Sequence, residues 1–266
     1  MEINKKEIQD IIKRTNALLT EKEAERLFSL TKNLSKNGVI VEIGSYKGGS
    51  AIILAKGAKK HNKNKVYAID PHNNPLGSHD KTSPDIIPKN TLPFFIENIK
   101  KEGLEGEVVP IVKTSEEAAK NWKKPISLLW IDGNHLYEFV KMDFILWEKY
   151  LVKGGIIAFH DSWEGGGFNG PVKVIEENIS NSKRFSDIKI IDRITFAKKI
   201  RVADFSERQK NKLNLLSIKI RIPYQRIFIW INKNLGLLGI FLKKNHPKMY
   251  ITLKKIKKMI SKLKQK

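Results

Sequence analysis

Two carboxylates and an imidazole follow two apolar runs in the second half of the chain. Residues 126–131 lead into Asp132, and residues 156–159 lead into His160 and Asp161. Apolar runs of this length are typical of central parallel strands, whose carboxyl ends meet at one edge of a sheet. The three side chains are therefore expected to converge and to bind a divalent cation, Mg²⁺ or, because of the histidine, Mn²⁺ or iron. The alternative is that the acids cap helices or hold loops.

A glycine turn near residue 45 is the second chemical feature. Residues 39–41 are apolar and lead into Glu42, after which Gly44 and Gly48 precede a helical stretch. A strand, a glycine turn and a helix in this order open a nucleotide-type site in doubly wound sheets. Asp70 ends the next apolar run, where a carboxylate suits the two hydroxyls of a ribose. Glu42 would repel a phosphate and favours a cofactor with an amine and a sulfonium, S-adenosylmethionine, although an ordinary tight turn would look similar.

The elements that must position these residues alternate along the chain. We expect strands near residues 39–41, 66–69, 107–112, 126–132, 156–161, 188–191 and 194–197. Helices are expected over residues 4–15, 20–35, from 51, 91–101, 135–150 and from 170. This order predicts an α/β fold, a Rossmann-like, doubly wound and mostly parallel seven-stranded sheet with an antiparallel edge hairpin.

Several local features qualify this outline. Thr20 and Glu23 match a capping box, and Ser50 and Thr91 are expected to cap the helices that follow them. Residues 71–90 are polar and rich in proline, which favours a mobile lid on the substrate side. Histidines on such a loop, here His72 and His79, are expected to be solvated unless they bind a metal.

Three short motifs stand in a fixed order along the chain. Residues 41–50 read VEIGSYKGGS, residues 69–72 read IDPH, and residues 131–135 read IDGNH. As a set they resemble class I S-adenosylmethionine-dependent methyltransferases. Within that class the chain is similar to the macrocin and mycinamicin type of sugar O-methyltransferase, whose scaffold cephalosporin hydroxylase shares. The likeness runs from about Thr20 to about Lys199 and implies that fold and that cofactor.

The resemblance also implies a set of cofactor-binding residues. Relatives often place an acid on the adenine where this chain has Thr114, so the adenine contact is assigned to Ser115. In metal-dependent relatives the three metal-binding positions are all acids, and His160 departs from that pattern. The residues assigned to the cofactor are Glu42, Gly44, Ser45, Gly48, Ser50, Asp70, His72, Ser115 and Asp132.

His135 is the candidate catalytic residue. Methyl transfer to a hydroxyl requires a base, and an imidazole, with an unperturbed pKa near ~6.5, is suited to that role at neutral pH. Some relatives carry an acid at the position of Asn134, but an amide cannot accept a proton. The base is therefore placed at His135, three residues after Asp132, the alternative being a residue that caps a helix or belongs to a lid.

Composition separates a catalytic domain from a basic extension. The chain of 266 residues has no cysteine, which excludes disulfides and thiolate metal sites, and its start lacks the apolar core of a signal peptide. A cytoplasmic location is expected. We predict a methyltransferase domain over residues 1–200, with N-terminal helices in 1–36, and an extension over 201–266. The extension holds eighteen Lys or Arg and two acids, which is +16 of the net charge of +22.

The extension has apolar stripes at helical spacing opposite basic faces. Basic amphipathic helices of this kind suit an anionic membrane surface, at the inner face of the membrane. The alternatives are packing on the catalytic domain or on a second copy in a homo-oligomer, and, less favoured, nucleic acid.

The sequence as a whole predicts an O-methyltransferase that acts on a hydroxyl of a small polar acceptor, a sugar or a lipid-linked glycan, with the assistance of a divalent metal. One rival is an RNA methyltransferase. The other is a catalytically silent scaffold that attaches to membranes.

Overall fold

The computed structural model describes residues 3–73, 90–162, 169–180 and 182–200, together with Gln209 and Leu213. The chain divides into two compact units, residues 1–218 and 219–266, and every helix and strand named below lies in the first. Most of the predicted lid with His79, the glycines at 165–167 and nearly all of the basic extension lie outside the described residues. The domain boundary at residue 200 stays a prediction.

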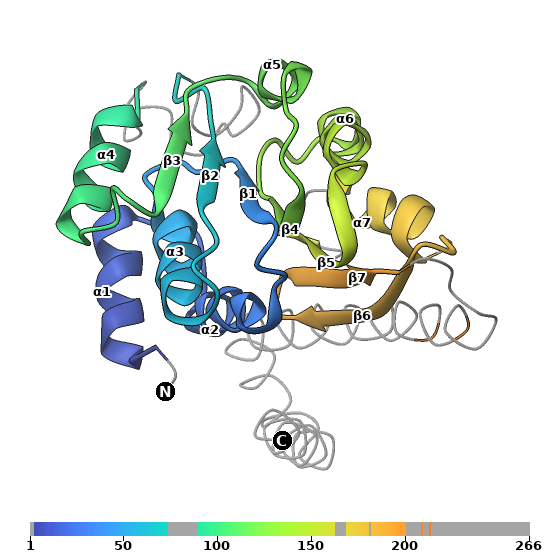
Figure 1. Cartoon of the computed structure of the whole chain (residues 1–266), viewed down its shortest axis with the longest axis horizontal. Helices are drawn as coiled ribbons and strands as arrows, with labels where there is room; N and C mark the ends of the chain where they lie inside the picture. Colours follow the sequence, from blue (N-terminus) through green and yellow to red (C-terminus); the bar gives the residue numbers. More distant parts are fainter. Residues whose placement is uncertain are drawn as a thin grey trace, which may run out of the picture. The chain divides into compact units, whose positions relative to one another are not determined.

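Seven strands form one sheet in the order β3-β2-β1-β4-β5-β7-β6 (Figure 1). The strands are β1 (Val39–Ile43), β2 (Val66–Ile69), β3 (Val108–Ile111), β4 (Ile126–Ile131), β5 (Leu151–Phe159), β6 (Phe185–Ile191) and β7 (Ile194–Lys199). The first five strands pair parallel with one another, whereas β7 pairs antiparallel with both β5 and β6. The predicted doubly wound sheet with an antiparallel edge hairpin is confirmed.

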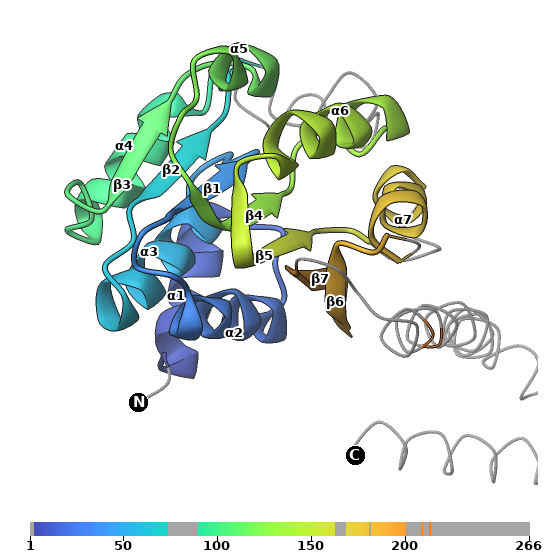
Figure 2. The same ribbon diagram turned by 45° about the vertical axis from the view of Figure 1, so that its right-hand side comes forward.

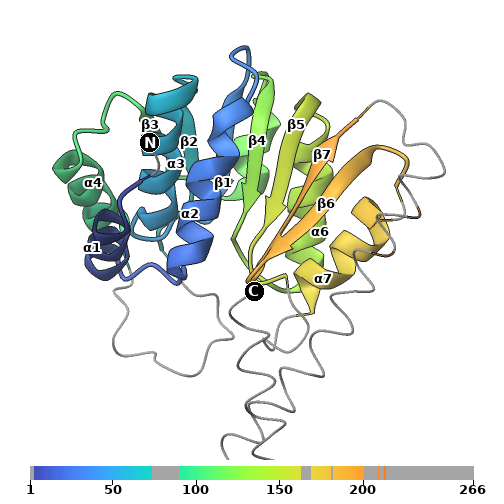
Figure 3. The same cartoon turned by 90° about the horizontal axis from the view of Figure 1, so that it is seen from below.

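Helices cover both faces of the sheet (Figures 2 and 3). They are α1 (Lys5–Thr15), α2 (Glu21–Leu30), α3 (Gly49–His61), α4 (Leu92–Lys101), α5 (Ser115–Lys120), α6 (Tyr137–Glu148) and α7 (Gly170–Ile175), with the short helices η1 (Thr31–Asn33) and η2 (Glu176–Ser180). The apolar residues of α1 to α4 pack in one core layer, and those of α5 to α7 pack in another.

Side-chain alternation along the central strands explains the two layers. Leu128 and Trp130 of β4 belong to the layer of α1 to α4, whereas Leu129 and Ile131 belong to the layer of α5 to α7. Successive side chains of a strand point to opposite faces, so a strand that is apolar at each of these positions must be covered on both. All six residues of β4 are buried, which confirms its central position.

Of the predicted helix caps, one is confirmed and two are wrong. The capping box of Thr20 and Glu23 is present at the start of α2. The predicted caps at Ser50 and Thr91 are wrong: α3 begins at Gly49 after the N-cap residue Gly48, and Thr91 makes no side-chain cap although it stands at the N-cap of α4. His135 lies before α6, not inside it.

Among the described residues, none of the helices has the length and apolar character that a membrane crossing requires.

Candidate functional site

The carboxyl ends of β1, β4 and β5 bring the predicted site residues to one edge of the sheet. Ile43 pairs with Ile131, which pairs with Phe159, so Asp132 and His160 follow residues in register. The ladder continues beyond the strands, because the Asp132 amide donates to the Ile43 carbonyl at 2.9 Å and the His160 amide to the Ile131 carbonyl at 3.0 Å. The predicted convergence of these two strand ends is confirmed.

The glycine turn after β1 is shaped by close packing against the end of β4. Gly44 has φ +84°, and a Cβ atom built on it would lie 2.3 Å from the carbonyl oxygen of Asp132. Only glycine fits both the dihedral angle and that contact. Gly48, with φ +89°, ends the turn as the N-cap residue of α3.

Asp70 holds this turn from the neighbouring strand. Its Oδ2 accepts hydrogen bonds from the backbone amides of Ser45, at 2.9 Å, and Tyr46, at 2.8 Å. Its Oδ1 accepts a bond from the amide of His72 at 2.7 Å. The Asp70 carboxylate therefore fixes the backbone beside the Gly44 turn, and the ribose contact expected of it stays a prediction.

Glu42 is a fully buried carboxyl group at the end of β1. Neither of its oxygens has a hydrogen-bond partner within the described residues. The buried hydroxyl of Ser45 also lacks a partner there. Burial raises the pKa of Glu42 to about 8; the Ser50 hydroxyl opposes that rise, and the charges of Asp132 and Asp70 add to it. A buried acid without a partner costs stability, which suits a group that pairs with a cation of a ligand.

His72 and Ser115 are more enclosed than the sequence suggested. His72 is 1% exposed, its Nδ1 lies 2.8 Å from Thr91 Oγ1, and its ring packs against Phe95. The expectation of a solvated loop histidine is wrong, because α4 closes over it. Ser115 is the first residue of α5, and its hydroxyl accepts a bond from Trp147 Nε1 at 2.8 Å.

Asp143 is a buried acid that the sequence analysis missed. It is 3% exposed on α6, and its Oδ1 has no hydrogen-bond partner in the described part of the chain. Burial raises the pKa of Asp143 to about 7, against the opposing effect of the Ser115 hydroxyl. The available signal was its place at helical spacing between the apolar residues Val140 and Trp147.

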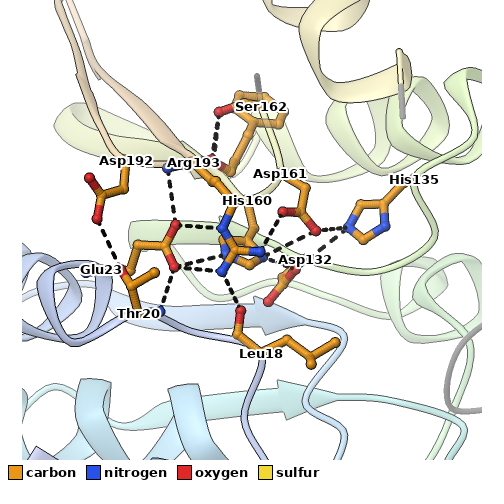
Figure 4. Close-up of polar contacts among 11 residues, drawn as sticks. Leu18, Thr20, Glu23, Asp132, His135, His160, Asp161, Ser162, Asp192 and Arg193 are labelled. Carbon is orange, nitrogen blue, oxygen red and sulfur yellow. Dashed lines mark hydrogen bonds and ion pairs between the residues drawn. The ribbon is translucent and has the colours of Figure 1, made fainter. Parts of the chain in front are cut away.

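Asp132, His135, His160 and Asp161 form a cluster after β4 and β5 (Figure 4). His135 Nε2 lies 3.7 Å from Asp132 Oδ1 and 3.6 Å from Asp161 Oδ2. His160 Nδ1 lies 2.9 Å from Asp132 Oδ1 and 3.7 Å from Asp161 Oδ2. Two imidazoles thus face the same two carboxylates.

Glu23 and Arg193 extend this cluster, and the sequence analysis missed both in this role. Glu23 on α2 is fully buried; its Oε2 lies 3.5 Å from His160 Nε2 and 2.8 Å from Arg193 Nη2. Arg193, in the turn between β6 and β7, also donates from Nε to Glu23 at 3.0 Å and from Nη1 to Asp161 Oδ1 at 3.0 Å. A helix, two strand ends and a hairpin turn therefore share one ion-pair network (Figure 4).

The network sets the ionisation of its members. Burial acts to lower the pKa of His160, but the charge of Asp132 and hydrogen bonds with Asp132 and Glu23 raise it to about 10. Burial likewise acts to raise the pKa of Glu23, but hydrogen bonds from His160 and Arg193 lower it to about 2. The pKa of Asp132 is lowered, since the two histidines outweigh its burial.

The predicted metal ligands come together but do not fit a metal ion. His160 Nδ1 is hydrogen-bonded to Asp132 Oδ1 at 2.9 Å, and its Nε2 lies 3.5 Å from Glu23 Oε2, so a carboxylate oxygen stands on the side of each ring nitrogen from which a metal would approach. Asp132 Oδ1 is bonded to His160, and Asp161 Oδ1 is bonded to Arg193. Within residues 3–73, 90–162, 169–180 and 182–200, no cluster of three or more His, Cys, Asp or Glu side chains could hold a metal.

The backbone at His135 is fixed by the start of α7. A Cβ atom built on Gly170 would lie 2.2 Å from the carbonyl oxygen of His135, so the two segments are in contact. The Asn134 side chain accepts a bond from the Leu136 amide at 2.9 Å and shapes the same loop. This loop carries His135 between β4 and α6, at the edge where the carboxylates lie.

Comparison with known proteins agrees with this geometry. Residues 41–162 match the family model described as a methyltransferase domain. Over 126 residues the chain is 32% identical to the uncharacterized protein R132 of Acanthamoeba polyphaga mimivirus, a match that covers 46% of this chain and 50% of that protein. The chain thus spans about half the length of this curated relative.

Solved structures share the fold at low identity. The TDP-rhamnose 3'-O-methyltransferase CalS11 of calicheamicin biosynthesis is 14% identical, with a TM-score of 0.50 over 74% of this chain and 81% of that one. An O-methyltransferase from Bacillus cereus in complex with SAH is 14% identical, with a TM-score of 0.53 over 72% and 90%. The fold is therefore that of class I methyltransferases.

Proposed function

We propose that the protein transfers a methyl group from S-adenosylmethionine to a hydroxyl oxygen of a small polar acceptor. One observation carries the proposal: His135 faces the carboxylates of Asp132 and Asp161 at the sheet edge where the Gly44 turn and the unpartnered Glu42 also lie. The match of residues 41–162 to a methyltransferase domain supports the reaction class.

The residues around the Gly44 turn fit this cofactor. Glu42 and the Ser45 hydroxyl are buried polar groups without hydrogen-bond partners in the described structure, and a carboxylate suits an ammonium group. When bound, the cofactor supplies an electrophilic methyl group on a sulfonium sulfur. Asp70 keeps the turn in shape through the amides of Ser45 and Tyr46. The assignments of Gly48, Ser50, His72, Ser115 and Asp132 to the cofactor stay predictions.

His135 acts as the general base in this proposal. With Nε2 directed at the two aspartates, the imidazole takes the proton of the acceptor hydroxyl. The acceptor oxygen forms its bond to the methyl carbon as the carbon–sulfur bond breaks. Asp132 and Asp161 orient the imidazole and stabilise its charged form.

A sugar, free or lipid-linked, is the acceptor that we propose. The CalS11 structure, named as a TDP-rhamnose 3'-O-methyltransferase, supports this class, although a 14% identity supports the fold more than the substrate. Leu136 and Phe139 are exposed next to His135 in the chain and offer apolar area for a sugar ring. No step above uses the divalent metal expected from the sequence, because the residues at its predicted site do not fit one.

We also propose that the basic extension binds an anionic membrane surface and places the enzyme at the inner face of the membrane. The net charge of +16 over residues 201–266 and its apolar stripes support this partner. Such an enzyme would meet lipid-linked glycans at the membrane where it binds. Nucleic acid and a second copy of the chain are the competing partners.

Replacement of His135 tests the base. His135→Gln should lower turnover by about 10²–10⁴-fold and leave the affinity for S-adenosylhomocysteine, the demethylated cofactor, unchanged. His61→Gln, at the far end of α3, is the control and should keep turnover. Steady-state rates and calorimetry give the two readouts, and a small rate change in His135→Gln would remove the base assignment.

Mass spectrometry tests the reaction itself. Candidate sugar nucleotides, lipid-linked glycans and RNA are incubated with the protein and a methyl-labelled cofactor, and products are searched for the added mass. Label in a glycan supports the proposal, whereas label in RNA alone would contradict it and indicate an RNA methyltransferase. Failure to bind the cofactor would instead support the hypothesis of a catalytically silent scaffold.

A further inference from the structure

The cluster at the ends of β4 and β5 contains two fixed cations. The guanidinium of Arg193 is charged at any physiological pH, and it contacts both Glu23 and Asp161. His160 Nδ1 is bonded to Asp132 at 2.9 Å, and Glu23 and Asp161 oxygens lie 3.5 Å and 3.7 Å from its ring nitrogens, so three carboxylates surround the buried imidazole and favour its charged form. Both cations are held in place. His160 is 2% exposed, and Arg193 is hydrogen-bonded to Glu23 on α2 and to Asp161 after β5.

The charges of the cluster match those of an all-acid metal site. Three carboxylates with one divalent ion carry a net charge of −1. Here three carboxylates, Glu23, Asp132 and Asp161, are joined by His160 and Arg193, and the net charge is also −1. Protonation of His135 by the acceptor hydroxyl then brings the cluster to neutrality.

We propose that His160 and Arg193 supply the positive charge that a divalent ion supplies in all-acid relatives, so that this site works without a bound metal. The inference rests on the proposed O-methyl transfer and deepens it. His160 and Arg193 are positioning residues, because they act on the acceptor only through Asp132, Asp161 and His135. Glu23 completes the arrangement by binding both cations from the side opposite to the aspartates.

Manganese binding tests the proposal without reference to turnover. Electron paramagnetic resonance of free Mn²⁺ is followed as the wild-type chain is titrated, with and without S-adenosylhomocysteine. No saturable binding is expected. A saturable wild-type site that disappears in Asp132→Asn would overturn the proposal.

A gain-of-function variant gives the positive test. His160→Asp restores the all-acid set at positions 132, 160 and 161, and it should create a saturable Mn²⁺ site. Asn37→Asp adds one carboxylate at an exposed position and measures the level of non-specific binding. A folded His160→Asp chain that binds S-adenosylhomocysteine but no Mn²⁺ would contradict the inference.

The wild-type enzyme in chelator provides the last readout. Turnover with excess chelator should equal turnover with added Mg²⁺ or Mn²⁺, and a loss in chelator that metal restores would overturn the proposal. If His160→Asp does not fold, the wild-type titration and this comparison still decide. Failure of the proposed function appears separately, as absent cofactor binding or absent product.

Discussion

Two buried acids, Glu42 and Asp143, hold their protons more tightly in the folded chain than in the unfolded chain. Glu42 has a pKa of about 8 and Asp143 a pKa of about 7, and in both cases burial is the main cause. Each group binds a proton more tightly when folded than when unfolded, so each lowers the free energy of unfolding as the pH rises between the two pKa values. Their chemical roles differ, because Glu42 lies at the turn proposed to hold an ammonium group.

The affinity for S-adenosylhomocysteine should rise with pH through Glu42. Pairing with the ammonium of the ligand requires the ionised carboxylate, so affinity should increase by up to about tenfold per pH unit below pH 8. Glu42→Gln should bind more weakly and lose this dependence, whereas Glu105→Gln, at an exposed position, should retain it. Calorimetry at several pH values measures both effects, and a flat wild-type profile would contradict the pairing.

Asp143 should make the protein less stable as the pH rises from about 4 to about 7. The free energy of unfolding should fall by about 1.4 kcal/mol per pH unit on account of this group, because only the folded state holds its proton there. Asp143→Asn should remove that part of the slope and be the more stable chain at pH 8. Denaturant unfolding at several pH values tests this, with the exposed Asp10→Asn as the control that keeps the slope.

At the scale of elements, Glu23 links helix α2 to two separate parts of the sheet. It caps α2 through Thr20, faces His160 after β5 and binds Arg193 in the turn between β6 and β7. Loss of one partner of a buried ion pair leaves an uncompensated charge, which is far more costly than loss of a surface pair.

Glu23→Gln should therefore destabilise the protein by roughly 3–5 kcal/mol near neutral pH. In the wild type, the pKa of about 2 means that the contribution of Glu23 is present above about pH 4.5 and is lost as the pH falls toward 2. The variant should lack this acid-dependent loss. Glu25→Gln, exposed on the same helix, is the matched control, and equal unfolding curves for the two variants would refute the role of Glu23.

At the scale of the whole molecule, the charge is concentrated in the extension. Full-length protein should sediment with anionic vesicles at low salt and much less with neutral vesicles, since each lysine near such a surface contributes on the order of 1 kcal/mol and salt screens it. Replacement of Lys254, Lys255, Lys257, Lys258 and Lys262 by glutamine should release the protein while leaving cofactor binding intact. Binding to RNA but not to vesicles would favour the nucleic-acid partner.

The sequence by itself determined the sheet and the edge at which the site lies. Apolar runs followed by Glu42, Asp70, Asp132 and Asp161 define parallel strands, and the carboxyl ends of such strands must meet, so the convergence follows from local pattern alone. The glycine turn is equally local, because Gly44 takes a positive φ angle that only glycine adopts readily.

Tertiary structure alone decided what these groups bind and how they ionise. Glu23 and Arg193 are 170 residues apart in the chain, and their bonds to His160 and Asp161 exist only once α2 and the β6–β7 turn close on the sheet. The burial of His72 under α4 and of Asp143 among apolar residues of α6 has the same origin. A pKa depends on all the charges and on the water within a few ångströms, which come from elements remote in sequence.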